Sequence, residues 1–205
     1  AAGAWLHVDA VQAAGRVAVD LRALGADSLA LSGHKLGGHP GAGALLLAPG
    51  MALPPLIAGG GQERGRRGGT HALPAIAGFA AAALCDAPDL APLRDAAEQA
   101  AIAAGAVVLG AAAARLGNTT CLALPGVAAQ TQVIALDLAG IQVAAGAACS
   151  SGKVARSHVL DAMGAGPLAG EAIRVSLPWN ATEADIAAFA AAYQAMAARL
   201  SRRAA

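Results

Sequence analysis

Short apolar runs separated by small and polar residues mark the first part of the chain. The runs at 5–9, 28–31 and 43–47 have the length and the bounding residues of short buried strands. Residues 11–24 leave room for a short helix or a turn between the first two strands. An apolar stretch at 74–85, with a proline in its first turn, predicts a helix.

Helical and extended patterns alternate through the rest of the chain. An alanine-rich stretch at 90–104 and a second stretch at 131–138 predict helices. The amphipathic segment 182–200 predicts a closing helix, with Thr182 as its N-cap and acidic residues in its first turn. Strands are expected at 106–109, 120–124, 141–144 and 173–177. This alternation is typical of a compact α/β domain.

The clearest boundary between the first part of the chain and the rest is the segment Asp86–Asp89, with Pro92 close behind it. We therefore predict two domains, residues 1–88 and 89–205, and 205 residues suffice for two small cores. The chain shows no internal repeat and no glycine fingerprint of a nucleotide-binding loop.

Composition narrows the class of protein. The chain is 57% apolar but only 2% aromatic, so its core is expected to consist of alanine, valine and leucine. A net charge of +1 gives no reason to expect binding to nucleic acid or to an anionic membrane. The longest apolar run, 72–85, is shorter than the roughly 20 residues that span a bilayer. The start lacks an export signal, so we expect a cytoplasmic protein.

Three cysteines form no metal-ligand pattern with the five histidines, so no metal site is expected. An odd number of cysteines also favours a reducing compartment. Cys85 and Cys121 fall in predicted apolar elements and are expected to be buried hydrophobic residues. Cys149 differs because it lies in a stretch of small residues.

Lys35 is the first candidate for chemistry. It follows the 28–31 strand, and a lysine at the mouth of an apolar pocket becomes nucleophilic toward carbonyl groups. Asp9 ends the preceding strand, and two parallel strands would bring both side chains to one sheet edge. Pyridoxal phosphate needs such a lysine, and a carboxylate that keeps its pyridine nitrogen protonated. The alternatives are a solvated loop lysine and a helix N-cap aspartate.

Five segments in order resemble the cysteine desulfurases, which are class V aminotransferase-like, fold-type I pyridoxal phosphate enzymes. They are His7–Gln12, Ser32–Lys35, Gly59–Thr70, Gly146–Gly152 and Ile173–Leu177. The resemblance implies an α/β fold in which residues 1–88 are the carboxyl-terminal part of the cofactor-binding large domain and residues 89–205 the small domain. In that family a long segment precedes the first of these strands. We therefore expect a fragment of the carboxyl-terminal half to two-thirds, or a chain completed by another.

The same resemblance implies cofactor ligands. Lys35 would bind pyridoxal 5'-phosphate covalently, Asp9 would face the pyridine nitrogen, and Gln12 would hydrogen-bond the phenolic oxygen. The phosphate ligands would be Ser32, His34 and, reaching the neighbouring site of a homodimer, Thr70. A hydroxyl and an imidazole N–H are suitable phosphate partners. His39 and His71 differ from the usual sequence of the family, and we interpret both as loop variation without functional consequence.

By resemblance, Arg174 would hold the α-carboxylate of the substrate L-cysteine, for which its guanidinium fork is suited. Cys149 would take the sulfur as a persulfide, leave L-alanine, and pass the sulfur to an acceptor or scaffold protein. That acceptor would serve iron–sulfur cluster assembly or transfer-RNA thiolation. From the residues alone, Arg174 could also extend from a strand edge. A transaminase, a selenocysteine lyase and a truncated non-catalytic remnant remain alternatives.

Overall fold

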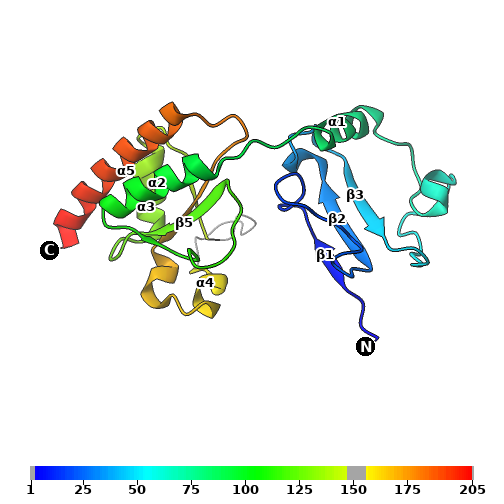
Figure 1. Cartoon of the computed structure of the whole chain (residues 1–205), viewed down its shortest axis with the longest axis horizontal. Helices are drawn as coiled ribbons and strands as arrows, with labels where there is room; N and C mark the ends of the chain where they lie inside the picture. Colours follow the sequence, from blue (N-terminus) through cyan, green and yellow to red (C-terminus); the bar gives the residue numbers. More distant parts are fainter. Residues whose placement is uncertain (1–2, 147–155, 205) are drawn as a thin grey trace. The chain divides into compact units, whose positions relative to one another are not determined.

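The computed structural model describes residues 3–146 and 156–204. The chain forms two units, residues 1–87 and 88–205, and the division falls within the Asp86–Asp89 segment (Figure 1). Strands and helices occur in both units, which confirms the α/β class predicted from the sequence.

The first unit contains a three-stranded sheet in the order β1-β2-β3. Strand β1 (His7–Asp9) pairs in parallel with β2 (Ser28–Ser32), as predicted, and β2 pairs antiparallel with β3 (Gly43–Leu47). A short 3₁₀ turn, η1 (Gly33–Lys35), follows β2 at its carboxyl end and packs against helix α1 (Leu73–Ala83). The sheet therefore delivers the ends of β1 and β2 to one edge, as Figure 1 shows.

The segment 11–24 forms turns and no helix. Gly15 adopts a φ of +75°, and a Cβ at this position would lie 2.5 Å from Leu36 Cδ2. The left-handed backbone favours glycine here, and a larger residue would also displace the end of the Leu36 side chain. Asp20 holds a second turn, because its Oδ1 accepts hydrogen bonds from the amides of Arg22 (2.7 Å) and Ala23 (3.0 Å). Tertiary packing and local side-chain bonds thus decide between the helix and the turn.

The second unit contains a four-stranded sheet in the order β4-β5-β7-β6, and every neighbouring pair is antiparallel. Its strands are β4 (Val107–Val108), β5 (Thr119–Ala123), β6 (Ala144–Ala145) and β7 (Ala172–Ser176). Its long helices are α2 (Ala91–Ala103), α3 (Ala129–Asp137) and α5 (Glu183–Ala204). Two short elements before β7, α4 (His158–Ala162) and η3 (Gly166–Gly170), were not predicted.

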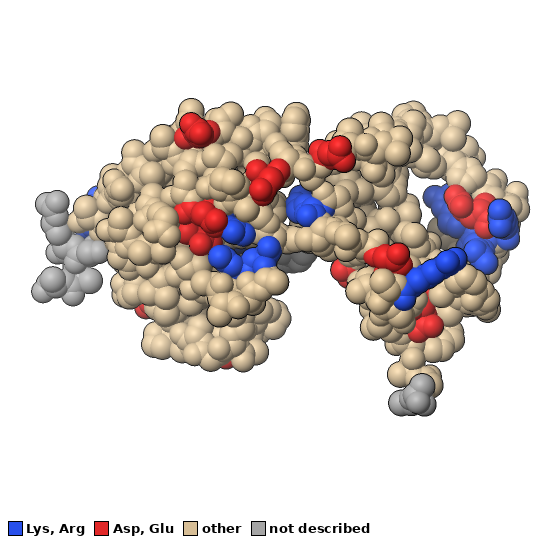
Figure 2. Space-filling model, viewed as in Figure 1, with Lys and Arg blue, Asp and Glu red and all other residues tan. Residues whose placement is uncertain are grey.

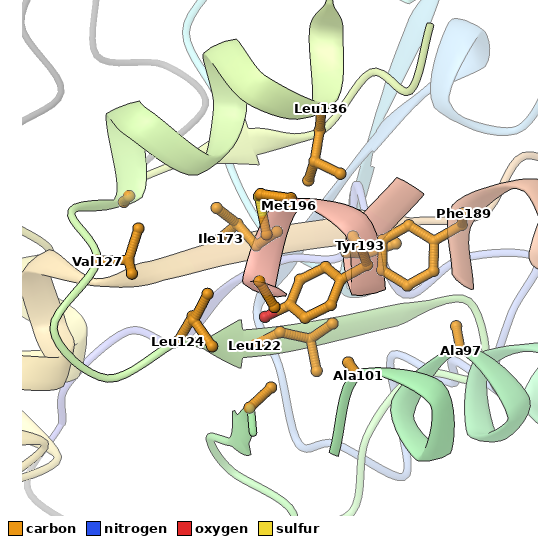
Figure 3. Packing of buried hydrophobic residues seen from close by; sticks show 14 of the residues in the cluster. Ala97, Ala101, Leu122, Leu124, Val127, Leu136, Ile173, Phe189, Tyr193 and Met196 are labelled. Atoms are coloured by element: carbon orange, nitrogen blue, oxygen red, sulfur yellow. The ribbon is translucent and has the colours of Figure 1, made fainter. Parts of the chain in front are cut away.

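Side chains from α2, α3, α5, β5 and β7 form the core of the second unit (Figure 3). Tyr193, Leu122 and Ile173 are fully buried at its centre, and the Phe189 and Tyr193 rings lie 5.5 Å apart between centroids. Burial raises the pKa of Tyr193 to about 12. The core therefore combines small aliphatic residues with two of the chain's few aromatic ones, a concentration that composition did not predict.

Leu122→Ala is expected to destabilise the second unit by about 2–5 kcal/mol, because it removes a fully buried side chain and leaves a cavity. Chemical unfolding followed by circular dichroism measures the change. Leu138→Ala is the matched control: this leucine is 81% exposed, so its loss should cost less than about 0.5 kcal/mol. Similar losses for the two variants would contradict this packing.

A nearly buried ion pair ties α2 to the segment before β5. Arg115 Nη1 lies 2.6 Å from Glu98 Oε1, and Arg94 Nε lies 3.8 Å from the same oxygen. Glu98 is only 7% exposed. Burial alone would raise the pKa of Glu98, but stabilising interactions, first among them the hydrogen bond from Arg115, outweigh it and lower that pKa below its ordinary value.

Glu98→Gln is expected to lower the free energy of unfolding by about 1–3 kcal/mol at neutral pH, because it leaves Arg115 without its anionic partner. The folded-state pKa of Glu98 is depressed, so the stabilisation is complete above the ordinary value of 4.5 and is lost as the pH falls through the folded-state pKa. The difference between wild type and variant should therefore shrink in acid. Asp95→Asn, at a side chain that is 57% exposed, should change little at any pH.

Candidate active site

The chain turns sharply at the carboxyl end of β2, and Lys35 ends this turn. Gly33 is buried, and its amide donates to the carbonyl of Ala42 at 3.0 Å. A Cβ at position 33 would lie 3.0 Å from Phe79 Cβ and 3.1 Å from Ala42 O, so a larger residue would force the turn away from α1. The Lys35 side chain is exposed within this unit.

Two polar side chains flank the lysine at the end of β2. Ser32 Oγ lies 2.9 Å from Nδ1 of His34, which is hydrogen-bonding distance. The hydroxyl and the imidazole can both donate hydrogen bonds, so this pair has the chemistry of a phosphate-binding group. The Ser-Gly-His-Lys sequence therefore places an amine next to two potential anion ligands.

Asp9 and Gln12 lie on the neighbouring strand and the turn that follows it. The register pairs Asp9 with Ala30, two residues before Ser32, so Asp9 lies at the same sheet edge as the Lys35 turn. Asp9 Oδ1 accepts a hydrogen bond from the Val11 amide at 3.0 Å, which holds a turn, not the helix N-cap considered from the sequence. Gln12 lies exposed on this turn.

Thr70 ends the glycine-rich loop 59–70, and side chains of this loop hold it in place through hydrogen bonds. The Gly69 amide donates to Gln62 Oε1 at 3.2 Å, and His71 Nε2 lies 3.1 Å from Glu63 Oε1. His71 thus has a partner in the loop, which its interpretation as neutral variation did not predict. Thr70 is exposed and forms no hydrogen bond with the Lys35 turn among the described residues.

The same loop carries positive charge. Arg64, Arg66 and Arg67 are exposed, and Figure 2 shows basic side chains gathered at this end of the first unit. Arg67 Nη1 donates to the carbonyls of Gly68 (3.0 Å) and Gly69 (3.1 Å). The loop is therefore a basic segment, held by its own hydrogen bonds, that ends at the exposed Thr70.

Arg174 lies in the second unit, on β7. This strand pairs with β5 and β6 on its two sides, so Arg174 does not extend from a sheet edge. Its register partners are Cys121 and Ala144. Arg174 is half-buried, and its Nε atom is buried without a hydrogen-bond partner among the described residues. A guanidinium in this state retains donors for an anionic ligand.

The three cysteines differ in setting. Cys149 lies outside the described residues. Cys121 is half-buried, and burial raises the pKa of its thiol, which the Arg174 charge offsets only in part. Cys85 is exposed beyond the end of α1, with Sγ 3.4 Å from the carbonyl of Ala81, so the expectation that it is buried was wrong.

Two negative findings apply to residues 3–146 and 156–204. No group of three or more histidine, cysteine or acidic side chains there could hold a metal ion. Nor does any helix in those ranges have the length and apolar character needed to cross a membrane.

Comparison with known proteins gives consistent matches. Residues 1–189 match the aminotransferase class-V family. A cysteine desulfurase from Bradyrhizobium diazoefficiens is 46% identical over 170 residues, which cover 79% of this chain and 43% of the relative. One from Cereibacter sphaeroides is 45% identical over 192 residues, 90% of this chain and 50% of the relative.

Solved structures agree. A NifS-like protein from Rickettsia africae has a TM-score of 0.82 at 35% identity, covering 94% of this chain and 53% of its own. A structure described as SspA in complex with cysteine has a TM-score of 0.67 at 30% identity, covering 85% of this chain and 50% of its own. The chain spans about half the length of the relatives it matches.

Proposed function

The chain belongs to the aminotransferase class-V family, and we propose that it forms part of a pyridoxal phosphate-dependent cysteine desulfurase. One observation carries the proposal: Asp9 ends β1 at the sheet edge where the parallel strand β2 delivers Ser32, His34 and Lys35. An acid, an amine and two phosphate donors at one edge are the groups that this cofactor requires. The match to relatives named cysteine desulfurase supports the reaction.

The residues of the first unit fit the cofactor. Ser32 and His34 would bind its phosphate, Gln12 its phenolic oxygen, and Asp9 would hold a proton on its pyridine nitrogen. When bound, pyridoxal phosphate withdraws electrons from the substrate Cα and stabilises the negative charge left there. Lys35 would attach the cofactor through its amine and, once released, accept the proton from the substrate Cα.

Arg174 and Cys149 would act on the substrate L-cysteine. The guanidinium of Arg174 would hold the α-carboxylate and so fix the orientation of the reacting bonds. The thiolate of Cys149 would attack the substrate sulfur: a sulfur–sulfur bond forms as the Cβ–S bond breaks. The electron pair left on carbon then takes up a proton. The products are L-alanine and a persulfide on Cys149.

Partners follow as further parts of the proposal. Thr70, at the end of its basic loop, would reach the phosphate in the neighbouring subunit of a homodimer. The persulfide would pass its sulfur to an acceptor or scaffold protein in the cytoplasm, for iron–sulfur cluster assembly or transfer-RNA thiolation. A structural neighbour solved with cysteine supports L-cysteine as the substrate.

Reductive trapping tests the cofactor assignment. The chain contains only two lysines, Lys35 and Lys153, so each serves as the other's control. Pyridoxal phosphate is added to the purified protein, the mixture is reduced with borohydride, and the modified lysine is located by peptide mass spectrometry. We expect a visible absorbance band before reduction and modification at Lys35. Equal modification of both lysines, or modification of Lys153 alone, would refute the assignment.

A further inference from the structure

We infer that Arg16 is a positioning residue for the cofactor site, because its guanidinium ties the turn that carries Gln12 to the turn that carries Lys35. Arg16 Nη1 donates to the carbonyl of Gln12 at 3.1 Å, and Nη2 donates to the carbonyl of Lys35 at 3.4 Å. That Gln12 and Lys35 belong to a cofactor site rests on the proposed function. The contact itself crosses 19 residues of sequence, and no sequence motif pointed to it.

Packing beside the arginine joins the same two segments. Gly15 stands so close to Leu36 that a Cβ at position 15 would lie 2.5 Å from Leu36 Cδ2. Its φ of +75° also requires the left-handed backbone that glycine adopts without strain. Two adjacent residues of one turn therefore meet the residues at and just after the lysine. The Arg16 guanidinium therefore bridges two turns that already pack against each other.

The chemistry of the guanidinium suits this bridge. Its N–H groups diverge in a rigid plane, so one side chain can reach two carbonyls that belong to different segments. A lysine carries its three donors on a single nitrogen, so it lacks the spread of the guanidinium fork. Arg16 forms no ion pair with a carboxylate among the described residues. Its charge is therefore directed at the two backbone carbonyls.

The bridge also completes a connected path through the proposed site. Asp9 Oδ1 accepts from the Val11 amide, which fixes the start of the turn next to Gln12. Arg16 then links the Gln12 carbonyl to the Lys35 carbonyl. The Asp9 carboxylate and the backbone at Gln12 and Lys35 are thus linked by one set of hydrogen bonds. A displacement of about 1 Å in such a set can cost a large factor in rate.

Amide hydrogen exchange tests the bridge without any cofactor. The amides of Leu36 and Gly38 donate to the carbonyl of Gly33 and report on the Lys35 turn. Arg16→Met should speed their exchange about tenfold, the scale of one lost charge-assisted hydrogen bond, and Arg16→Lys should have a smaller effect. Arg22→Met is the control, because this exposed arginine lies in the same segment and its side chain bonds neither turn among the described residues. Unchanged exchange in Arg16→Met would overturn the inference whatever the cofactor does.

Reductive trapping then tests the link to the cofactor site. The ratio of modification at Lys35 to that at Lys153 should fall about tenfold in Arg16→Met, recover partly in Arg16→Lys, and stay unchanged in Arg22→Met. Faster exchange with an unchanged ratio would show that Arg16 only supports the fold, which overturns the positioning role. If wild type itself shows no preference for Lys35, the proposed function fails, and the exchange result still shows whether the bridge exists.

Discussion

Lys35→Ala is expected to abolish formation of alanine from L-cysteine, with a loss of at least about a thousandfold in the cofactor-loaded protein. In the proposed mechanism, the substitution removes both the covalent attachment of the cofactor and the group that accepts the Cα proton. General acid–base catalysis alone is worth about 10²–10⁴. The fold should survive, because the Lys35 side chain is exposed and Gly33, not Lys35, makes the close contacts of the turn.

Alanine release, the visible absorbance band and chemical unfolding should be measured together for this variant. Lys153→Ala is the matched control and should retain all three properties. An unfolding free energy that stays within about 0.5 kcal/mol of wild type would show that lost activity reflects lost chemistry. Retained turnover in Lys35→Ala would exclude this lysine as the cofactor attachment site.

Cys149→Ala is expected to remove persulfide formation and sulfide release while leaving cofactor binding intact. In the proposed mechanism the Cys149 thiolate takes the sulfur, and alanine carries no nucleophilic group that could replace it. A transaminase on the same fold would not need this cysteine. Turnover of L-cysteine in Cys149→Ala would therefore favour the transaminase alternative and contradict a desulfurase.

The other two cysteines are controls for that experiment. Cys85 is an exposed thiol beyond the end of α1, and Cys121 is a half-buried thiol whose pKa is raised by burial. A raised pKa lowers the fraction of reactive thiolate at neutral pH. Replacing either by alanine should leave sulfide release near the wild-type level. Peptide mapping that finds the persulfide on Cys85 or Cys121 would show that the assignment of Cys149 is wrong.

Local patterns determined the elements that carry the candidate site. The strand at 43–47 was predicted at its observed bounds, and the strand before Lys35 differs by one residue at its end. Parallel pairing of the first two strands followed from where Asp9 and Lys35 fall after apolar runs. Helices α2 and α5 followed from composition, caps and periodicity. Such features depend on residues within a few positions of one another, so they are legible in a single sequence.

Contacts between distant residues were decided only by the tertiary structure. Leu36 lies against the turn at Gly15, and Arg16 reaches the Lys35 carbonyl across 19 residues. The all-antiparallel sheet of the second unit and the Glu98–Arg115 pair likewise join segments far apart in the chain. The stability of these contacts depends on burial and on the distances between particular atoms. The residue types next to them in the sequence do not specify either quantity. The sequence by itself thus determined the chemistry that this chain carries, and packing decided how those groups are held.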